Sequence, residues 1–208
     1  MLTVALDGFG QSQAQIAGLH TRLTDLTPLY QRLAGTLEHE TELNLDAEGR
    51  PKWQEWASST KARRLANNNG SSVLKMLQDH GILAASISSE SGSDFVIISA
   101  GGAASDYAPA QQLGATINRA PYSTKVRLRT DAKGNLLRQG KSPNLAVFAK
   151  DTHKRVRESW HEVQAFTIRI PARPYLPFTG PAEAPVLQPQ AETSLLATIT
   201  RYINDTAD

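Results

Sequence analysis

The sequence predicts an α+β fold, and two observations on its apolar residues lead to this prediction. Apolar residues recur at helical spacing near both ends of the chain, in residues 13–43 and 193–203. Between these ends, apolar and polar residues alternate with the period of two that is typical of half-buried strands, most clearly in residues 166–170. Because a short turn joins two neighbouring strand segments, we expect an antiparallel sheet flanked by the helices.

Composition limits the possible classes of protein. The 208 residues suffice for one domain with its own core, and we expect a single domain over residues 1–208. Cysteine is absent, which excludes disulfides, thiolate metal sites and cysteine nucleophiles, and which agrees with synthesis in a reducing cytosol. The first residues lack a basic, then apolar, signal-peptide pattern, and no apolar run approaches the roughly 18–20 residues of a membrane span. We therefore expect a soluble protein that does not contact a membrane.

The N-terminal region is expected to be mainly helical. A short strand is predicted over residues 2–6, followed by a helix over residues 13–26. Thr27 and Pro28 have the pattern of an N-cap followed by proline, so a second helix starts there, although one long helix bent at Pro28 fits equally well. A turn-rich loop is expected in residues 44–52.

The next region alternates between helix and strand signals. We expect a serine-capped helix that continues through residues 73–77 and stops at Gly81, followed by strands over residues 83–88 and 94–99 that form a hairpin. Large aromatic side chains should anchor this half of the chain to the core, and the expected anchors are Trp53, Trp56 and Tyr107.

Residues 119–157 are strongly basic. Eleven of the 22 Lys and Arg residues lie in this window, together with only two acidic residues. Val126–Arg129 alternates like a strand, residues 131–135 have the composition of a turn, and Leu136 and Leu137 could start a returning strand. The pattern therefore predicts a basic β-hairpin arm inserted in the domain.

Two interpretations of this arm remain open. It can be a solvated, flexible insertion, or it can contact a polyanion or an acidic partner surface. Basic side chains at alternating strand positions line one face, which suits contact with phosphates without sequence readout. Aromatic residues are too sparse there for stacking on single strands. The candidate contact residues are Lys125, Arg127, Arg129, Lys133, Arg138 and Lys141.

Residues 170–178, which we call the elbow, follow the strand at residues 166–170. Pro171 and Pro174 fix the backbone and remove two hydrogen-bond donors, so the strand cannot continue. Two interpretations are open: a corner that packs its aromatic residues on its own core, or a rigid segment that docks onto a neighbouring subunit. The candidate interface residues are Pro171, Arg173, Pro174, Tyr175, Leu176 and Phe178. An extended connector (180–189) and a final helix capped by Thr193 are expected after it.

Catalytic and metal-binding motifs are not evident. The five histidines lack metal-ligand spacing, and the nearest mimic, Trp160-His161-Glu162, has no second histidine. Gly101-Gly102 lacks the spacing of a dinucleotide loop, and neither a phosphate-binding loop nor a serine nucleophile elbow is present. We therefore expect no catalytic residues, no metal and no cofactor.

Four sequence blocks that occur in order resemble the phage virion morphogenesis family, the tail completion proteins of Mu-like and related tailed bacteriophages. The block Ile-Pro-Ala-Arg-Pro-Tyr-Leu is the most specific. Three positions depart from the family pattern: Gln111 replaces a usual histidine, Tyr175 a phenylalanine and His80 a threonine. The four blocks are Gly49–Trp53, Leu77–Leu83 with Ser86-Ile87, Tyr107-Ala108 with Gln111–Gly114, and Ile170–Leu176.

This resemblance implies a small α+β protein with an antiparallel sheet flanked by helices and a structural, non-enzymatic role. Such a protein forms a homo-oligomeric ring, expected here to hold six copies, as a tail terminator or a neck component at the head–tail junction. The implied partners are the tail tube protein, connector or portal-proximal proteins, and packaged DNA passing through the lumen. The protein would be made in the host bacterial cytoplasm and located in the virion. The alternative function is a DNA-binding module that acts through residues 119–157.

Overall fold

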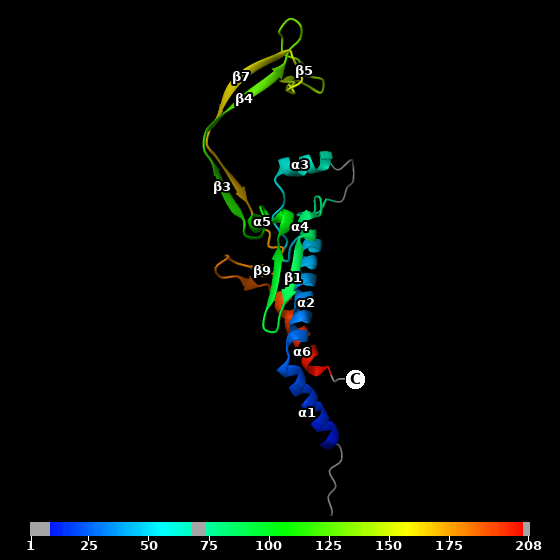
Figure 1. Cartoon of the computed structure of the whole chain (residues 1–208). Helices are drawn as coiled ribbons and strands as arrows, with labels where there is room; N and C mark the ends of the chain where they lie inside the picture. Colours follow the sequence, from blue (N-terminus) through cyan, green and yellow to red (C-terminus); the bar gives the residue numbers. More distant parts are fainter. Residues whose placement is uncertain (1–8, 68–73, 206–208) are drawn as a thin grey trace, which may run out of the picture. The chain divides into compact units, whose positions relative to one another are not determined.

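A computed structural model describes residues 9–67 and 74–205, which form two compact units. Unit 1 contains the described residues up to Ala115 and from Ile170 onward, and unit 2 runs from Thr116 to Arg169 (Figure 1). Helices and two-stranded β-ladders are both present, so the predicted α+β class is confirmed. The strand expected over residues 2–6 lies outside the described residues.

Unit 1 contains all the helices that the structure describes. They are α1 (Phe9–Thr24), α2 (Thr27–Ala47), α3 (Ser58–Asn67), α4 (Ile82–Ala85), the 3₁₀ turn η1 (Gly102–Ala104), α5 (Ala108–Leu113) and α6 (Pro189–Asn204). Two small antiparallel ladders accompany them, namely β1 (Ile87–Ser91) with β2 (Val96–Ala100) and β9 (Phe178–Thr179) with β10 (Val186–Leu187).

The N-terminal region forms two helices rather than one bent helix. The break falls at Asp25, whose Oδ1 accepts a hydrogen bond from the backbone N–H of Thr27 at 3.0 Å. Thr27 is the first residue of the helix rather than its N-cap, which is Leu26, and Asp25 satisfies the free N–H of Thr27. The Thr27 hydrogen bonds lower the pKa of the Asp25 carboxyl below its usual value. Pro28 lies in the first turn of α2, where its missing N–H costs nothing.

Four expected elements differ from the structure. The described part of the helix predicted up to Gly81 consists of turns, with Leu77 in the left-handed region at φ 60°, and a four-residue helix begins after Gly81 where a strand was expected. The final helix starts at Pro189 instead of Thr193, whose hydroxyl lies inside the helix and donates to the Pro189 carbonyl. The expected connector contains β10, which pairs with β9 just before it.

In unit 1, α2 packs on the β1–β2 hairpin and against α6, and the core cluster lies around Leu45 in the last turn of α2. The short elements α4, η1 and α5 each contribute one buried apolar residue to it. Tyr175, from the elbow, is 2% exposed and is the largest fully buried side chain among the described residues. Burial, with a further contribution from nearby Tyr107, raises the pKa of Tyr175 to about 12. The core residues are Leu45, Trp53, Met76, Leu83, Ala104, Ala108 and Tyr175.

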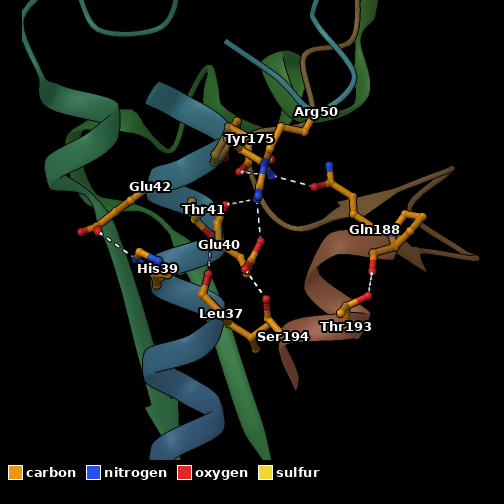
Figure 2. A network of polar contacts seen from close by, with 12 residues as sticks. Leu37, His39, Glu40, Thr41, Glu42, Arg50, Tyr175, Gln188, Thr193 and Ser194 are labelled. Atoms are coloured by element: carbon orange, nitrogen blue, oxygen red, sulfur yellow. Dashed lines mark hydrogen bonds and ion pairs between the residues drawn. The ribbon is translucent and has the colours of Figure 1, made fainter. Parts of the chain in front are cut away.

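A polar network crosses the interior of unit 1 beside this core (Figure 2). Glu40 of α2 is 3% exposed; one of its carboxylate oxygens accepts from the Arg50 guanidinium at 2.6 Å, and the other accepts from the Ser194 hydroxyl of α6 at 2.6 Å. One turn further along α2, the Asn44 side chain accepts from Arg50 Nε at 2.9 Å and donates to Gln188 Oε1 at 2.8 Å. The network therefore joins α2, the loop after it and the start of α6.

Ionisation of Glu40 is favoured in spite of its position. Burial by itself would raise the pKa of Glu40, but the hydrogen bonds from Ser194 and Arg50, with the charge of Arg50, outweigh burial and hold it below the usual value. A carboxylate with a depressed pKa stabilises the fold at neutral pH. That contribution declines as the pH falls below the ordinary glutamate value of 4.5 toward the depressed one.

Unit 2 is a β-structure built on two ladders. β4 (Tyr122–Arg129) pairs antiparallel with β7 (Val156–Val163) over eight residues, and β3 (Ala115–Arg119) pairs with β8 (Phe166–Ile170). Figure 1 shows these ladders in succession along one ribbon. A small hairpin of β5 (Arg138–Gln139) and β6 (Ser142–Ala146) lies between β4 and β7 in the chain. The predicted strand at Val126–Arg129 is thus part of β4, but its partner is β7 instead of Leu136 and Leu137, which contribute one bridge.

We predict that Glu40→Gln lowers the free energy of unfolding at pH 7 by about 2 to 3 kcal/mol, because it leaves the Arg50 guanidinium without its carboxylate. Urea denaturation measures the loss. The difference from the wild type should shrink as the pH falls from 4.5 toward the depressed pKa of Glu40, because the unfolded wild type binds a proton at Glu40 before the folded protein does. Glu42→Gln is the matched control, since that side chain is 74% exposed on the same helix. Equal stability of the two variants would contradict the role given to the network.

We also predict that Tyr175→Ala lowers the free energy of unfolding by about 3 to 5 kcal/mol, because it opens a cavity in the core. Tyr175→Phe should cost about 1 kcal/mol or less, since the hydroxyl makes only a 3.4 Å contact with the Ala108 carbonyl. Thermal unfolding followed by circular dichroism measures both changes. Tyr122→Ala, at an exposed tyrosine of unit 2, serves as the control and should leave the melting of unit 1 unchanged.

Candidate functional site

The elbow obtains its backbone hydrogen bonds from side chains and loops of its own unit. The Pro174 carbonyl accepts from Trp53 Nε1 at 3.2 Å, and the Tyr175 carbonyl accepts from Asn44 Nδ2 at 3.2 Å. The Pro177 carbonyl accepts from the backbone N–H of Gln188 at 3.0 Å. Because a proline-rich segment cannot complete a β-ladder, these partners replace the one it lacks.

Gln112 of α5 makes the closest set of contacts to the elbow. Its Oε1 accepts from the backbone N–H groups of Tyr175 and Leu176, both at 3.0 Å, and its Nε2 donates to the Phe178 carbonyl at 2.8 Å. The chain after α5 must also approach the elbow closely: a Cβ on Gly114, at φ 77°, would lie 3.0 Å from the Ala172 nitrogen. The third and fourth of the four sequence blocks therefore pack directly against each other within unit 1.

The interpretation of the elbow as a docking segment is wrong for its central residues. Arg173 and Tyr175 are buried within unit 1, and Arg173 donates to the Gln54 carbonyl from both Nε and Nη2 at 3.3 and 3.1 Å. Burial lowers the pKa of Arg173, yet these hydrogen bonds hold the charged group in place. The physical reason is that the prolines hold the elbow in a bend whose side chains pack into the core of unit 1.

The other elbow residues are partly accessible. Pro171 and Pro174 are half-buried, as are Leu176 and Phe178. Leu176 and Phe178 line an apolar pocket of about 230 Å³ together with Leu113 of α5 and the turn between β9 and β10. Of the predicted interface, these four elbow residues are the ones that a partner could still reach, and Leu176 and Phe178 supply its apolar pocket.

The predicted core anchors behave differently from one another. Trp53 is buried in the core, and Trp56 is half-buried, packs against it and carries the Arg64 guanidinium 5.4 Å from its ring centroid. The five residues after Lys52 are not helical, so the two tryptophans do not share a helix face. Tyr107 keeps 37% of its surface exposed and is not part of the core cluster, which corrects the expectation for that residue.

The predicted basic stripe lies on one face of the β4–β7 ladder, but acidic residues lie between its members. The register places Lys125 opposite Trp160 and Arg127 opposite Glu158. Glu158 forms ion pairs with both Lys125 and Arg127, and Arg127 also contacts Asp151 at 2.6 Å. The hydrogen bond from Lys125 is the main reason why the pKa of Glu158 lies below its usual value. Lys125 and Arg127 are therefore paired within the chain and are not free to follow phosphates.

The remaining basic residues gather between the end of β4 and the start of β7. Residues 129–157 carry eight Lys and Arg but only two acidic residues. Arg129 is half-buried, whereas Lys133, Arg138 and Lys141 are exposed. Among the described residues, none of these four takes part in an ion pair within 4.0 Å. The turn at Asp131 is well ordered, since its carboxylate accepts from the backbone N–H groups of Lys133 and Asn135.

Charge divides between the two units of the chain. Unit 2 has twelve Lys and Arg against four Asp and Glu, a net charge of +8. Unit 1 has ten Lys and Arg against sixteen Asp and Glu, a net charge of −6. The total of +2 therefore hides a strong separation of charge.

Unit 2 has no buried core. None of its residues from Thr116 to Arg169 is buried, although several of them are large and apolar. The alternation in β8 correctly predicted a strand, but Phe166 and Ile168, which should occupy its buried face, are about 40% exposed. Thr167 donates to Asn118 at 2.9 Å, so these polar residues share one face of the β3–β8 ladder, and Ile117, Phe166 and Ile168 share the other. Other exposed apolar residues of unit 2 are Tyr122, Leu145, Phe148 and Trp160.

Three residues that make decisive contacts were not predicted: Gln112, Glu40 and Glu158. Gln112 bonds the distant elbow, Glu158 pairs through the register of a long-range ladder, and Glu40 bonds Arg50 in the following loop and Ser194 in α6. A buried carboxylate gives no local signal, although the helical spacing of Glu40 with Leu37 and Asn44 placed it on the inward face of α2.

Residues 9–67 and 74–205 contain no cluster of three His, Asp or Glu side chains that could hold a metal ion. Within those ranges, no helix is long and apolar enough to cross a membrane.

Comparison with known proteins adds one finding to this geometry. The family model described as "Phage virion morphogenesis family" matches residues 9–192, which include all of unit 2 and most of unit 1. No curated protein and no solved structure shows a significant match to the chain. The match covers the four sequence blocks that α2, α5 and the elbow bring together in unit 1. The chain belongs to the phage virion morphogenesis family.

Proposed function

We propose that this chain is a non-enzymatic structural protein of the virion that assembles into a ring at the head–tail junction. The observation that best supports assembly is the exposed apolar face of unit 2. Its strand alternation has the pattern of a half-buried ladder, yet Ile117, Phe166 and Ile168 are 37%, 42% and 39% exposed, and no residue of unit 2 is buried. In a protein of this family, a layer supplied by another subunit is the simplest way to complete such a ladder.

The ring would complete the tail and join it to the capsid, as a tail terminator or as a neck layer. Its neighbours would be the tail tube protein on one side and connector or portal-proximal proteins on the other, with six copies in the ring. This location is the neck or tail end of the virion, and packaged DNA would pass through the lumen. The rigid unit 1, whose elbow is closed on its own core, suits a part that must bear load without rearranging.

We predict that phage lacking this gene accumulate separate heads and tails, because the ring that joins them is missing. Electron microscopy of lysates measures the ratio of joined to unjoined particles. Supplying the wild-type gene in trans is the control and should restore joined particles. Normal numbers of infectious virions without the protein would contradict the proposal, as would a strictly monomeric protein in the presence of its tube and connector partners.

A second candidate function is DNA binding through unit 2, and its net charge of +8 is the observation that favours it. This function predicts that the isolated protein binds double-stranded DNA tightly, with an affinity that falls steeply as salt increases. Fluorescence anisotropy with a labelled duplex measures it. Replacing Lys133, Arg138 and Lys141 with Ala should reduce the salt dependence, while replacing the paired Lys125 should change it less. Absence of binding at low salt would dismiss this function.

A further inference from the structure

We infer that the surface which covers unit 2 is the acidic unit 1 of a second copy of this chain. The inference rests on the proposed ring and names the contact that builds it. Three observations on unit 2 and unit 1 carry it: the separation of charge, the distribution of ion pairs and the exposed apolar side chains.

Charge complementarity selects the partner surface. Contact between two copies of unit 2 would bring net charges of +8 together, and contact between two copies of unit 1 would bring net charges of −6 together. Contact of unit 2 with unit 1 joins opposite charges, which steers association and disfavours the symmetric pairings. An interface between two different surfaces is also the kind that closes into a ring.

The ion pairs show which charges are available. Lys125 and Arg127 are neutralised within their own ribbon by Glu158 and Asp151. The basic residues between β4 and β7 that have no ion pair among the described residues include Lys133, Lys141, Lys150, Lys154 and Arg155. Unit 1 likewise has exposed acidic residues for which the described residues provide no ion pair, and these include Glu55, Glu90, Asp94, Asp106 and Glu183.

The apolar side chains favour a protein over a nucleic acid as the partner. Phe148 and Trp160 are 69% and 71% exposed, and Ile117, Phe166 and Ile168, which share a face of the β3–β8 ladder, are 37%, 42% and 39% exposed. A phosphate backbone would satisfy the positive charges but would leave these apolar groups in water. Unit 1 offers apolar surface beside its acids: Glu90 lies directly opposite Ile97 on the outward face of the β1–β2 hairpin, and Ile97 is 51% exposed.

A charge-exchange experiment on the full chain tests this contact. One variant carries Glu in place of Lys133, Lys141, Lys150, Lys154 and Arg155, which changes the charge of unit 2 from +8 to −2. The other carries Lys in place of Glu55, Glu90, Asp94, Asp106 and Glu183, which changes the charge of unit 1 from −6 to +4. Native mass spectrometry and size-exclusion chromatography follow self-association at several salt concentrations.

Each variant alone should associate at least about tenfold more weakly than the wild type, because each then repels its own copies. An equal mixture of the two should regain association, in complexes that contain equal numbers of both, since every contact again joins opposite charges. Recovery in the mixture also shows that both variants are folded. As a matched control, Lys61→Glu with Arg63→Glu reverses two exposed cations of unit 1 and should not weaken association.

The other outcomes distinguish a failure of the inferred contact from a failure of the proposed ring. Rings that persist in both variants would overturn the inferred contact and leave the ring function standing. Loss of association that the mixture does not restore, in variants with wild-type circular dichroism, would also overturn the contact. An unaltered ring with lost DNA retention in the unit 2 variant would assign that surface to DNA. A wild-type protein that never associates, alone or with tube and connector proteins, would overturn the contact and the ring together.

Discussion

The structure depends on how the backbone of a proline-rich elbow obtains its hydrogen bonds. Three prolines between residues 171 and 177 prevent this segment from joining a sheet, so its carbonyl and N–H groups must find other partners in the interior. Gln112 supplies three of these hydrogen bonds, and Asn44 and Trp53 supply one each. Since these side chains come from α5, α2 and the loop after α2, the elbow fixes all three relative to one another within unit 1.

The Glu40 network extends this constraint to the C-terminal helix. Ser194 and Gln188 at the start of α6 are connected through Glu40 and Asn44 to the same helix α2 that supports the elbow (Figure 2). Buried polar groups are costly unless they are fully paired, so the network tolerates few alternative arrangements. The central residues of the elbow are thus packed inside unit 1, and a partner would contact the outer surface of this unit instead.

Unit 2 follows the opposite principle. Its strands have the alternation of a half-buried ladder, but they bury no residue within the chain, and a two-stranded ribbon is marginally stable by itself. Glu158 forms ion pairs with Lys125 and Arg127 and so neutralises part of the positive charge of unit 2. The basic residues between β4 and β7 remain available to a partner. A protein in which one unit is complete and acidic and the other is coreless and basic has the two different surfaces that a closed ring of subunits requires.

The sequence by itself determined the α+β class, the helices near both ends, the strands at residues 126–129 and 166–170, the basic character of residues 119–157 and the family. These features rest on local periodicity, composition and short motifs, which neighbours in the chain specify. Only the tertiary structure decided that Tyr175 and Arg173 point into their own core, that β4 pairs with β7, and that Glu158 neutralises Lys125 and Arg127. Such outcomes depend on which distant segment pairs with each strand and which one packs on its apolar face. An alternating strand such as Phe166–Ile170 has the same sequence pattern whether the residues that pack on it belong to its own chain or to another chain.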